Sequence, residues 1–300
     1  MRMSDELFDS VFLAKLEQLH LLSRKIFRGQ HHAERRSRQM GSSLEFADYR
    51  TYTRGDDVRA IDWNIYARVE RLFIKLFEEE QDLHVFLLID ASASMRWTNG
   101  SERRSKFDQA RRIAASLGYI ALANLDRVNA LFFVNGLVDD LGFQRGRGRF
   151  HTLLHFLRQP LEPKGVTDLL ESFTAFSQRE KRRGLVVVLS DFLDTAGWED
   201  ALQRLRHQRF DVELVHVLDD EEITPTVSGD VRLDDIESGA SMEITADPAL
   251  LRAYRKTVQD FLDQLDAFAL RFGIGLARTK TSEAFEDAVL RTLRTSGMVR

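Results

Sequence analysis

The sequence predicts an α/β fold with a doubly wound, mostly parallel sheet. Residues 85–89 and 185–189 carry apolar side chains only, which is typical of strands that are buried on both faces of a parallel sheet. From residue 82 onward, strand-like and helix-like patterns alternate along the chain. This alternation favours parallel strands joined by helices that cover both faces of the sheet, in Rossmann-like layers.

The expected elements of the main domain, residues 82–300, follow from these patterns. Asn135-Gly136 is a strong hairpin signal between two of the strands. Residues 219–247 are polar and are expected to form an insertion. We expect strands at 83–89, 128–134, 137–143, 184–189, 211–218 and 273–277, and helices at 104–125, 150–158, 168–182, 197–208, 248–271 and 282–296.

Residues 1–81 are expected to form an N-terminal extension of helical and β structure that packs on the main domain. Helical spacing of apolar residues predicts a helix from residue 5 to about 27, and residues 72–77 form a further strand pattern. Between them lies a basic segment, residues 24–38. It could bind nucleic acid or anionic lipid, but it has no interleaved aromatic residue beyond Phe27 and the whole chain is acidic, which favours a solvated or partner-binding segment.

Bulk composition narrows the class of protein. The 300 residues include no cysteine, which excludes disulfides, zinc–thiolate sites and thiol catalysis. The net charge of −4 and the pI of about 6.1 argue against a generic polyanion binder. No apolar run approaches the length of a membrane span, and the N-terminus lacks the pattern of a signal peptide. We therefore expect a soluble cytoplasmic protein.

Oxygen-bearing side chains stand at three places near the expected carboxyl edge of the sheet. Asp90, Ser92 and Ser94 follow the first apolar strand, Thr167-Asp168 precedes a helix, and Ser190-Asp191 directly follows the second apolar strand. Ligands of open α/β sheets bind at the carboxyl ends of strands, and hard divalent cations prefer oxygen ligands. If the two apolar strands are neighbours, the sequence predicts a magnesium-type site between them.

In these residues the chain resembles the von Willebrand factor A-like fold over residues 82–300. The metal-ion-dependent adhesion site of that fold combines D-x-S-x-S with a Thr and an Asp on two later loops, in this chain order. The resemblance implies that Ser92, Ser94 and Thr167 touch an ion, Mg²⁺ or else Mn²⁺ or Ca²⁺. It also implies that Asp90 and Asp191 act wholly or partly through water, and that the ion keeps an open position for a partner protein's carboxylate.

A second group of residues lies in the extension, within residues 41–70. It consists of Glu45-Phe46, Arg50, Tyr52, Gly55-Asp56-Asp57, Arg59, Ile61-Asp62-Trp63 and Ala67-Arg68. The chain is similar there to the bacterial family called domain of unknown function fifty-eight, whose members are associated with MoxR-type AAA+ ATPases. Many members carry N-terminal membrane helices, and a chain without them is expected to be a soluble member.

The expected function is a non-enzymatic, metal-dependent binding module that serves as an adaptor of a MoxR-type AAA+ ATPase. The ATPase would supply work in complex assembly or remodelling, and this chain would supply recognition. The alternative is a magnesium-dependent phosphatase or phosphotransferase with Asp90 as nucleophile. Such a site needs a second carboxylate two residues on, where this chain has Ser92. A Rossmann nucleotide site is disfavoured because no strand is followed by G-x-G-x-x-G.

Structural interpretations compete with the functional ones. Asp90, Ser92 and Ser94 could be turn formers and caps, and Thr167-Asp168 could cap the following helix. We favour a scaffold role for the Arg54-Gly55-Asp56 stretch, with Asp56 or Asp57 capping a short helical turn and Arg50 or Arg59 pairing with Asp62. We expect the loop 145–149 and the histidines His31, His32, His151 and His155 to be surface features.

Overall fold

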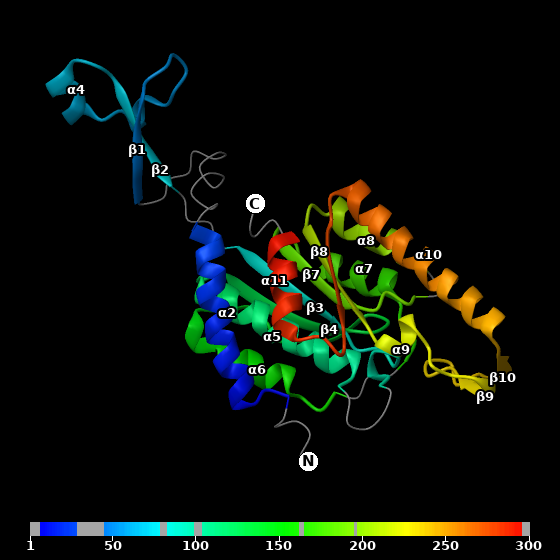
Figure 1. The fold of residues 1–300 in the computed structure, drawn as a ribbon. Coiled ribbons are helices and arrows are strands. Elements are labelled where there is room, and N and C mark those ends of the chain that lie inside the picture. Colours follow the sequence, from blue (N-terminus) through cyan, green and yellow to red (C-terminus); the bar gives the residue numbers. More distant parts are fainter. Residues whose placement is uncertain are drawn as a thin grey trace. The chain divides into compact units, whose positions relative to one another are not determined.

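The structure is a computed structural model that describes residues 7–28, 45–78, 83–98, 104–161, 165–194 and 197–295 (Figure 1). The chain divides into two compact units, Met1–Phe27 with Leu83–Arg300, and Arg28–Asp82. The sequence had suggested a division into 1–81 and 82–300. The two divisions differ in the first helix, α2 (Ser10–Arg28), which belongs with the sheet of the larger unit.

The larger unit is built on a seven-stranded sheet in the order β11-β8-β7-β3-β4-β5, with β6 also paired to β4. The pairs from β11 through β8, β7 and β3 to β4 are parallel, whereas β5 and β6 run antiparallel to β4. The predicted α/β fold with a mostly parallel sheet is confirmed. The strands are β3 (His84–Asp90), β4 (Arg127–Phe133), β5 (Leu137–Asp140), β6 (Gln144–Arg145), β7 (Leu185–Ser190), β8 (Asp211–Leu218) and β11 (Gly275–Lys280).

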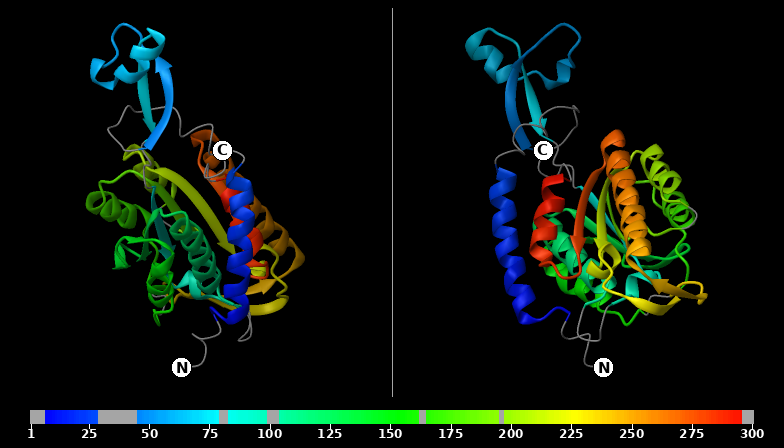
Figure 2. Two further views of the ribbon diagram at one scale, coloured as in Figure 1. Left: turned by 90° about the vertical axis from the view of Figure 1, so that its left-hand side faces the viewer. Right: turned by 45° about the vertical axis from the view of Figure 1, so that its right-hand side comes forward.

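Helices cover both faces of this sheet, as the views in Figures 1 and 2 show. One face packs against α2, α5 (Lys106–Ala123), α6 (Phe150–Leu157) and α11 (Phe285–Thr295). The other face packs against α7 (Leu169–Arg179), α8 (Glu199–His207) and α10 (Pro248–Phe272). Alternate residues of the central strands therefore enter two separate cores, which explains why β3 and β7 are apolar at successive positions.

The direction of chain winding reverses between β3 and β7. From β3 the chain passes through α5, on one face, to β4. From β7 it passes through α8, on the opposite face, to β8 on the other side of the sheet. The register aligns Leu87 with Val187 and Ile89 with Leu189, which confirms that the two apolar strands are neighbours. Such a switch point leaves a crevice for ligands outside the carboxyl ends of the two strands.

Several element ends lie a few residues from their expected positions, such as β11 at Gly275–Lys280 instead of 273–277, and two parts of the larger unit differ more from the sequence prediction. The expected strand 137–143 is shorter, because Gly142 adopts φ +73 and its amide donates to Asp140 Oδ1 (2.8 Å), which ends β5. The expected polar insertion 219–247 contains the helix α9 (Asp220–Ile223) and an antiparallel hairpin of β9 (Gly229–Asp234) and β10 (Ser241–Ala246). Most residues of this hairpin are exposed, so its strands lack the apolar alternation that identifies half-buried strands.

The smaller unit contains an antiparallel pair, β1 (Glu45–Thr51) and β2 (Phe73–Glu78), joined through η1 (Val58–Ala60) and α4 (Trp63–Val69). Asp57 caps η1 by accepting a hydrogen bond from the Arg59 amide (2.9 Å). The Arg50 guanidinium pairs with Asp56 (2.7 Å), so the expected pairing of Arg50 with Asp62 is wrong. These contacts agree with a scaffold role for this stretch.

Asp62 caps α4 by accepting hydrogen bonds from the Asn64 and Ile65 amides, and it also accepts one from the Tyr49 hydroxyl (3.1 Å). His151 and His155 are exposed on α6. His31, His32 and most of the basic segment 24–38 lie outside the described residues. Across the described ranges, no helix combines the length and the apolar character needed to cross a membrane.

Candidate functional site

The loop that follows β3 is fixed against two other loops at the carboxyl edge of the sheet. The Ala91 amide donates to the Phe133 carbonyl at the end of β4 (2.8 Å). The Ala93 amide donates to the Gly165 carbonyl in the loop before α7 (3.2 Å). These bonds place Ser92 and Ser94 beside the loop that carries Thr167.

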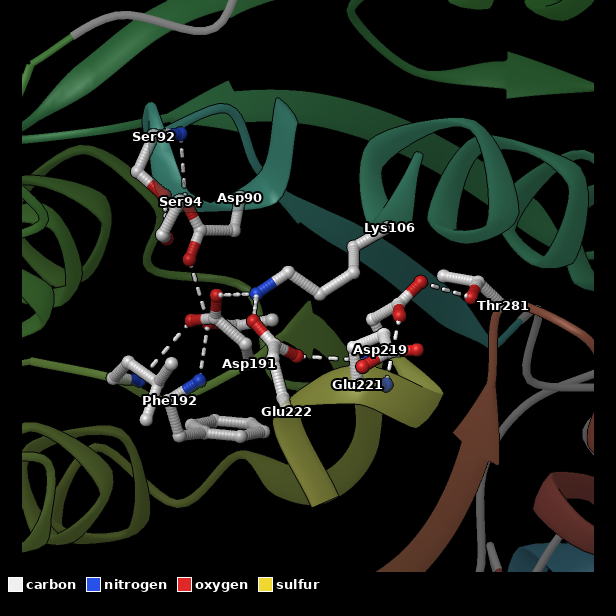
Figure 3. A network of polar contacts seen from close by, with 12 residues as sticks. Asp90, Ser92, Ser94, Lys106, Asp191, Phe192, Asp219, Glu221, Glu222 and Thr281 are labelled. Carbon is white, nitrogen blue, oxygen red and sulfur yellow. Dashed lines mark hydrogen bonds and ion pairs between the residues drawn. The ribbon is translucent and has the colours of Figure 1, made fainter. Parts of the chain in front are cut away.

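Asp90 lies at the end of β3 and is completely buried. Its Oδ1 accepts a hydrogen bond from the Ser92 amide (2.9 Å), and its Oδ2 accepts one from the Ser190 hydroxyl (2.6 Å). Figure 3 shows its carboxylate turned towards that of Asp191. Burial and, after it, the negative charge of Asp191 raise the pKa of Asp90 to about 7, although the hydrogen bonds from Ser190 and Ser92 act in the opposite direction. Both hydrogen-bond donors to Asp90 are neutral, so this carboxylate is poorly supplied with positive charge.

Asp191, directly after β7, has a different charge environment. Its Oδ2 accepts from Lys106 Nζ (2.6 Å), and its Oδ1 accepts from the Leu193 amide (3.0 Å). Burial alone would raise the pKa of Asp191, but the Lys106 ammonium and hydrogen bonds from Lys106, Leu193 and Ser94 lower it. Asp191 is therefore ionised although it is fully buried.

Lys106 is the first residue of α5, and its side chain is fully buried. Its ammonium pairs with Asp191 and also with Glu222 of α9 (Figure 3). Burial alone would lower the pKa of Lys106, but these two carboxylates outweigh burial and raise it. Burial raises the pKa of Glu222 in spite of the nearby ammonium. One ammonium thus pairs with two carboxylates. It lowers the pKa of Asp191 in spite of burial, but at Glu222 burial outweighs it.

The three hydroxyl groups that the sequence singled out lie on the two adjoining loops. Ser92 Oγ and Ser94 Oγ are 3.0 Å apart, and both side chains are buried. Thr167 is 3% exposed, and its hydroxyl donates to Glu237 Oε1 (3.2 Å). Asp168 caps α7 by accepting a hydrogen bond from the Glu171 amide (2.8 Å). The N-cap of this helix is therefore Asp168 and not Thr167.

Four of the five candidate residues form one hydrogen-bonded group, and the fifth lies in the adjoining loop. The group is Asp90, Ser92, Ser94 and Asp191; Thr167 is connected to it through the backbone bond between Ala93 and Gly165. Sequence reasoning did not predict the roles of four further residues of the site. These are Lys106, Glu222 and Glu237, together with Ser190, which the sequence placed among the oxygen-bearing residues but not as a hydrogen-bond donor to Asp90.

Some of these residues had local signals. Ser190 directly precedes Asp191, and Glu222 stands three residues after Asp219 in a capping box. Lys106 stands beside Ser105, the N-cap of α5, which indicates the start of a helix but gives no sign that the lysine is buried. We find no local signal for Glu237.

The donor set fits a hard cation. The hydroxyls and carboxylates are oxygen ligands, which Mg²⁺ and Ca²⁺ prefer, and the buried Asp90 carboxylate would be stabilised by added positive charge. In the part of the chain that the structure describes, no three His, Cys, Asp or Glu side chains are grouped to hold a metal. A cation at this place would therefore depend on the serine and threonine hydroxyls.

The fold and the site together define a doubly wound α/β protein with an oxygen-rich polar cluster at its switch point. The chain belongs to the family described as "Protein of unknown function DUF58", which matches residues 48–261. The family predicted from the signature in the extension is therefore confirmed.

Similar proteins are known from both sequences and solved structures. Uncharacterized proteins of Mycobacterium bovis and Mycobacterium tuberculosis are each 31% identical over 244 residues, which is 81% of this chain and 76% of theirs. An aerotolerance-related membrane protein from Bacteroides fragilis has 17% identity and a TM-score of 0.44, and BatB from Bacteroides thetaiotaomicron has 16% and 0.43. Each alignment covers 72% of this chain and 99% of the solved chain.

Proposed function

We propose that this protein is a non-enzymatic protein-binding module that depends on a divalent metal ion. One observation carries the proposal: Asp90, Ser92, Ser94 and Asp191 form one buried group beside the loop of Thr167. The group lies at the switch point of the sheet, where ligands of such folds bind. In this proposal the domain is of the von Willebrand factor A-like type, and the group is its metal-ion-dependent adhesion site.

The strand order supports this type of domain. Numbered along the chain from β3 and leaving out the short β6, the order β5-β4-β3-β7-β8-β11 reads 3-2-1-4-5-6, which is the doubly wound arrangement. The antiparallel edge strand β5 is a common addition to such a sheet.

Each candidate residue has a role in the proposed site. Ser92, Ser94 and Thr167 would hold the ion through their hydroxyl oxygens, and Asp90 and Asp191 would act wholly or partly through water. Mg²⁺ is the first choice, with Mn²⁺ or Ca²⁺ as substitutes. When bound, the ion supplies a coordination position that accepts a carboxylate from another protein. Lys106 keeps Asp191 ionised and in place.

The contacts of Asp90 favour binding over phosphoryl transfer. A nucleophilic carboxylate needs an oxygen that a substrate can reach, but both oxygens of Asp90 accept hydrogen bonds and the residue is completely buried. Ser92 stands where a general acid would be needed, and its hydroxyl is a poor acid at neutral pH. The phosphatase alternative therefore has less support from the geometry.

The proposed partner is a MoxR-type AAA+ ATPase or one of its client proteins, acting in the cytoplasm. This part of the proposal comes from the family resemblance. A pull-down of candidate ATPases with this protein, with and without EDTA, tests it. A complex that forms equally well in EDTA would contradict a metal-bridged contact.

Calorimetric titration with MgCl₂ and MnCl₂ tests the metal site directly. We expect wild-type protein to bind one ion and the variants Asp90→Ala and Ser94→Ala to bind at least ~10-fold more weakly, because a ligand or its orienting group is lost. Asp260→Ala, an exposed position on α10, is the matched control. Thermal unfolding checks that each variant is folded. Equal metal binding by wild type and both site variants would reject the site.

A further inference from the structure

In the hairpin of β9 and β10, the side chain of Glu237 is partly shielded from solvent. From residue 232 to residue 240 every residue is exposed except Glu237, which is half-buried. Its carboxylate receives two hydrogen bonds from Thr167, one from the hydroxyl to Oε1 (3.2 Å) and one from the amide to Oε2 (3.4 Å). These bonds connect residues that are 70 positions apart in the sequence.

The loop around Glu237 is held in a defined conformation. Asp235 Oδ1 accepts from the amides of Glu237 (2.8 Å) and Ser238 (3.2 Å), and the Ser238 hydroxyl donates to Asp235 Oδ2 (2.8 Å). Gly239 adopts φ +72, and its amide donates to the Asp235 carbonyl (2.8 Å). The chain therefore presents Glu237 at the tip of a tight turn.

The position of Glu237 matters because Thr167 is one of the proposed metal ligands. A hydroxyl group has one proton and two lone pairs, so Thr167 can donate to Glu237 and still offer oxygen lone pairs to a cation. A carboxylate that contacts a ligand of the ion stands where an acidic group from another protein would have to approach.

We propose that Glu237 is an internal carboxylate ligand that occupies the partner's position at the metal site. The inference rests on the proposed function and adds two points to it. The hairpin β9–β10 must move aside before a partner binds, and the partner offers the same chemistry, an acidic side chain at the tip of a tight turn. Because a tethered group competes at an effective concentration on the order of millimolar, it weakens binding of any partner carboxylate.

A synthetic peptide of residues 233–242 of this chain is a suitable probe, because it contains Glu237 and its turn. Its binding to the full-length protein is measured by fluorescence anisotropy in MnCl₂ and in EDTA. We expect Glu237→Gln protein to bind the peptide at least ~10-fold more tightly than wild type, because the internal competitor is gone. Binding should disappear in EDTA, and a peptide with Gln in place of Glu237 should not bind.

The matched control is Glu243→Gln, which removes the same charge from an exposed position on the same hairpin. This variant should behave like wild type in the peptide assay. Manganese titrations of the same proteins give a second measurement. Glu237→Gln should bind the ion several-fold more weakly than wild type, because it lacks one anionic ligand, and Glu243→Gln should not.

The outcomes separate this inference from the proposed function. If wild type binds metal through Asp90 but Glu237→Gln matches wild type for both metal and peptide, the internal ligand is rejected and the proposed function stands. If no protein in the series binds metal, both fail. Stronger peptide binding by Glu243→Gln than by Glu237→Gln would also overturn the inference, because the effect would then come from hairpin charge alone.

Discussion

At the scale of single residues, the site is defined by an uneven distribution of positive charge. Lys106 supplies its ammonium to Asp191 and Glu222, whereas the hydrogen-bond donors to Asp90 are neutral groups. Burial would raise the pKa of both carboxyls; Lys106 outweighs burial and lowers the pKa of Asp191, whereas burial and the charge of Asp191 raise that of Asp90. Lys106 is thus part of the structural support of the site, and the ion that we propose would complete the charge balance at Asp90.

The buried ion pair leads to a prediction about stability. Lys106→Met should lower the free energy of unfolding by ~3–5 kcal/mol, because it leaves Asp191 buried without its counter-charge. Urea unfolding, followed by circular dichroism, measures the loss. In the double variant Lys106→Met/Asp191→Asn part of the loss should be recovered, since the uncompensated charge is removed as well.

Lys280 provides the control for this prediction. Its ammonium lies 3.3 Å from Asp220, but both side chains are about 40% exposed, at 42% and 36%. Lys280→Met should therefore change the free energy of unfolding by less than ~1 kcal/mol. If both lysine variants lowered the free energy of unfolding by similar amounts, burial of the Lys106 ion pair would not account for the effect.

At the scale of elements, the site depends on the close alignment of β3 and β7. Gly184 precedes β7, and a Cβ atom built there would lie 2.2 Å from the His84 carbonyl oxygen. Gly184→Ala should therefore force the strands apart where they begin to pair and cost ~1–3 kcal/mol, measured by urea unfolding. Gly148→Ala, where a Cβ meets no atom within 4 Å, should stay within ~0.5 kcal/mol of wild type.

The turn between β1 and η1 gives a prediction for pH dependence. Hydrogen bonds from Thr53 and Arg50 lower the pKa of Asp56 below its ordinary value. The ionised Asp56 carboxylate therefore stabilises the folded state fully above the ordinary carboxyl pKa of ~3.9. This stabilisation is lost as the pH falls through the lower pKa that Asp56 has in the folded state. The amide resonance of Thr53, followed by NMR on acidification, should shift in that lower range. A transition well above the ordinary pKa, or an unchanged titration in Asp56→Asn, would contradict this assignment.

At the scale of the whole molecule, α2 belongs to the domain that contains the sheet. Phe12 of α2 is fully buried, with its ring 4.8 Å from that of Phe285 in α11 and 5.1 Å from that of Phe8. Phe12→Ala should therefore lower the free energy of unfolding by ~3–5 kcal/mol in the full-length chain. Val11→Ala, at a neighbouring position that is 59% exposed, should change it by less than ~0.5 kcal/mol. Equal effects of both variants would indicate that α2 does not stabilise the domain.

The sequence by itself determined the elements whose information is local. Apolar runs predicted β3 and β7, helical spacing predicted α5, α10 and α11, and Asn135-Gly136 predicted the turn between β4 and β5. The sequence also placed Asp90, Ser92, Ser94 and Asp191 at the ends of two central strands, where the structure shows them in one group. These predictions succeed because strand and helix periodicity, and the turn that ends a strand, depend on residues a few positions apart.

Tertiary structure alone decided which distant residues complete the site. Lys106 reaches Asp191 across 85 positions and Glu222 across 116, and Glu237 reaches Thr167 across 70. The burial of α2 beside α11 and the exposed hairpin of β9 and β10 are decided in the same way. The residues that flank a lysine or glutamate in the sequence do not indicate whether its side chain lies in water or against a distant polar group. Its role is fixed only when folding brings the charges together and removes the water between them.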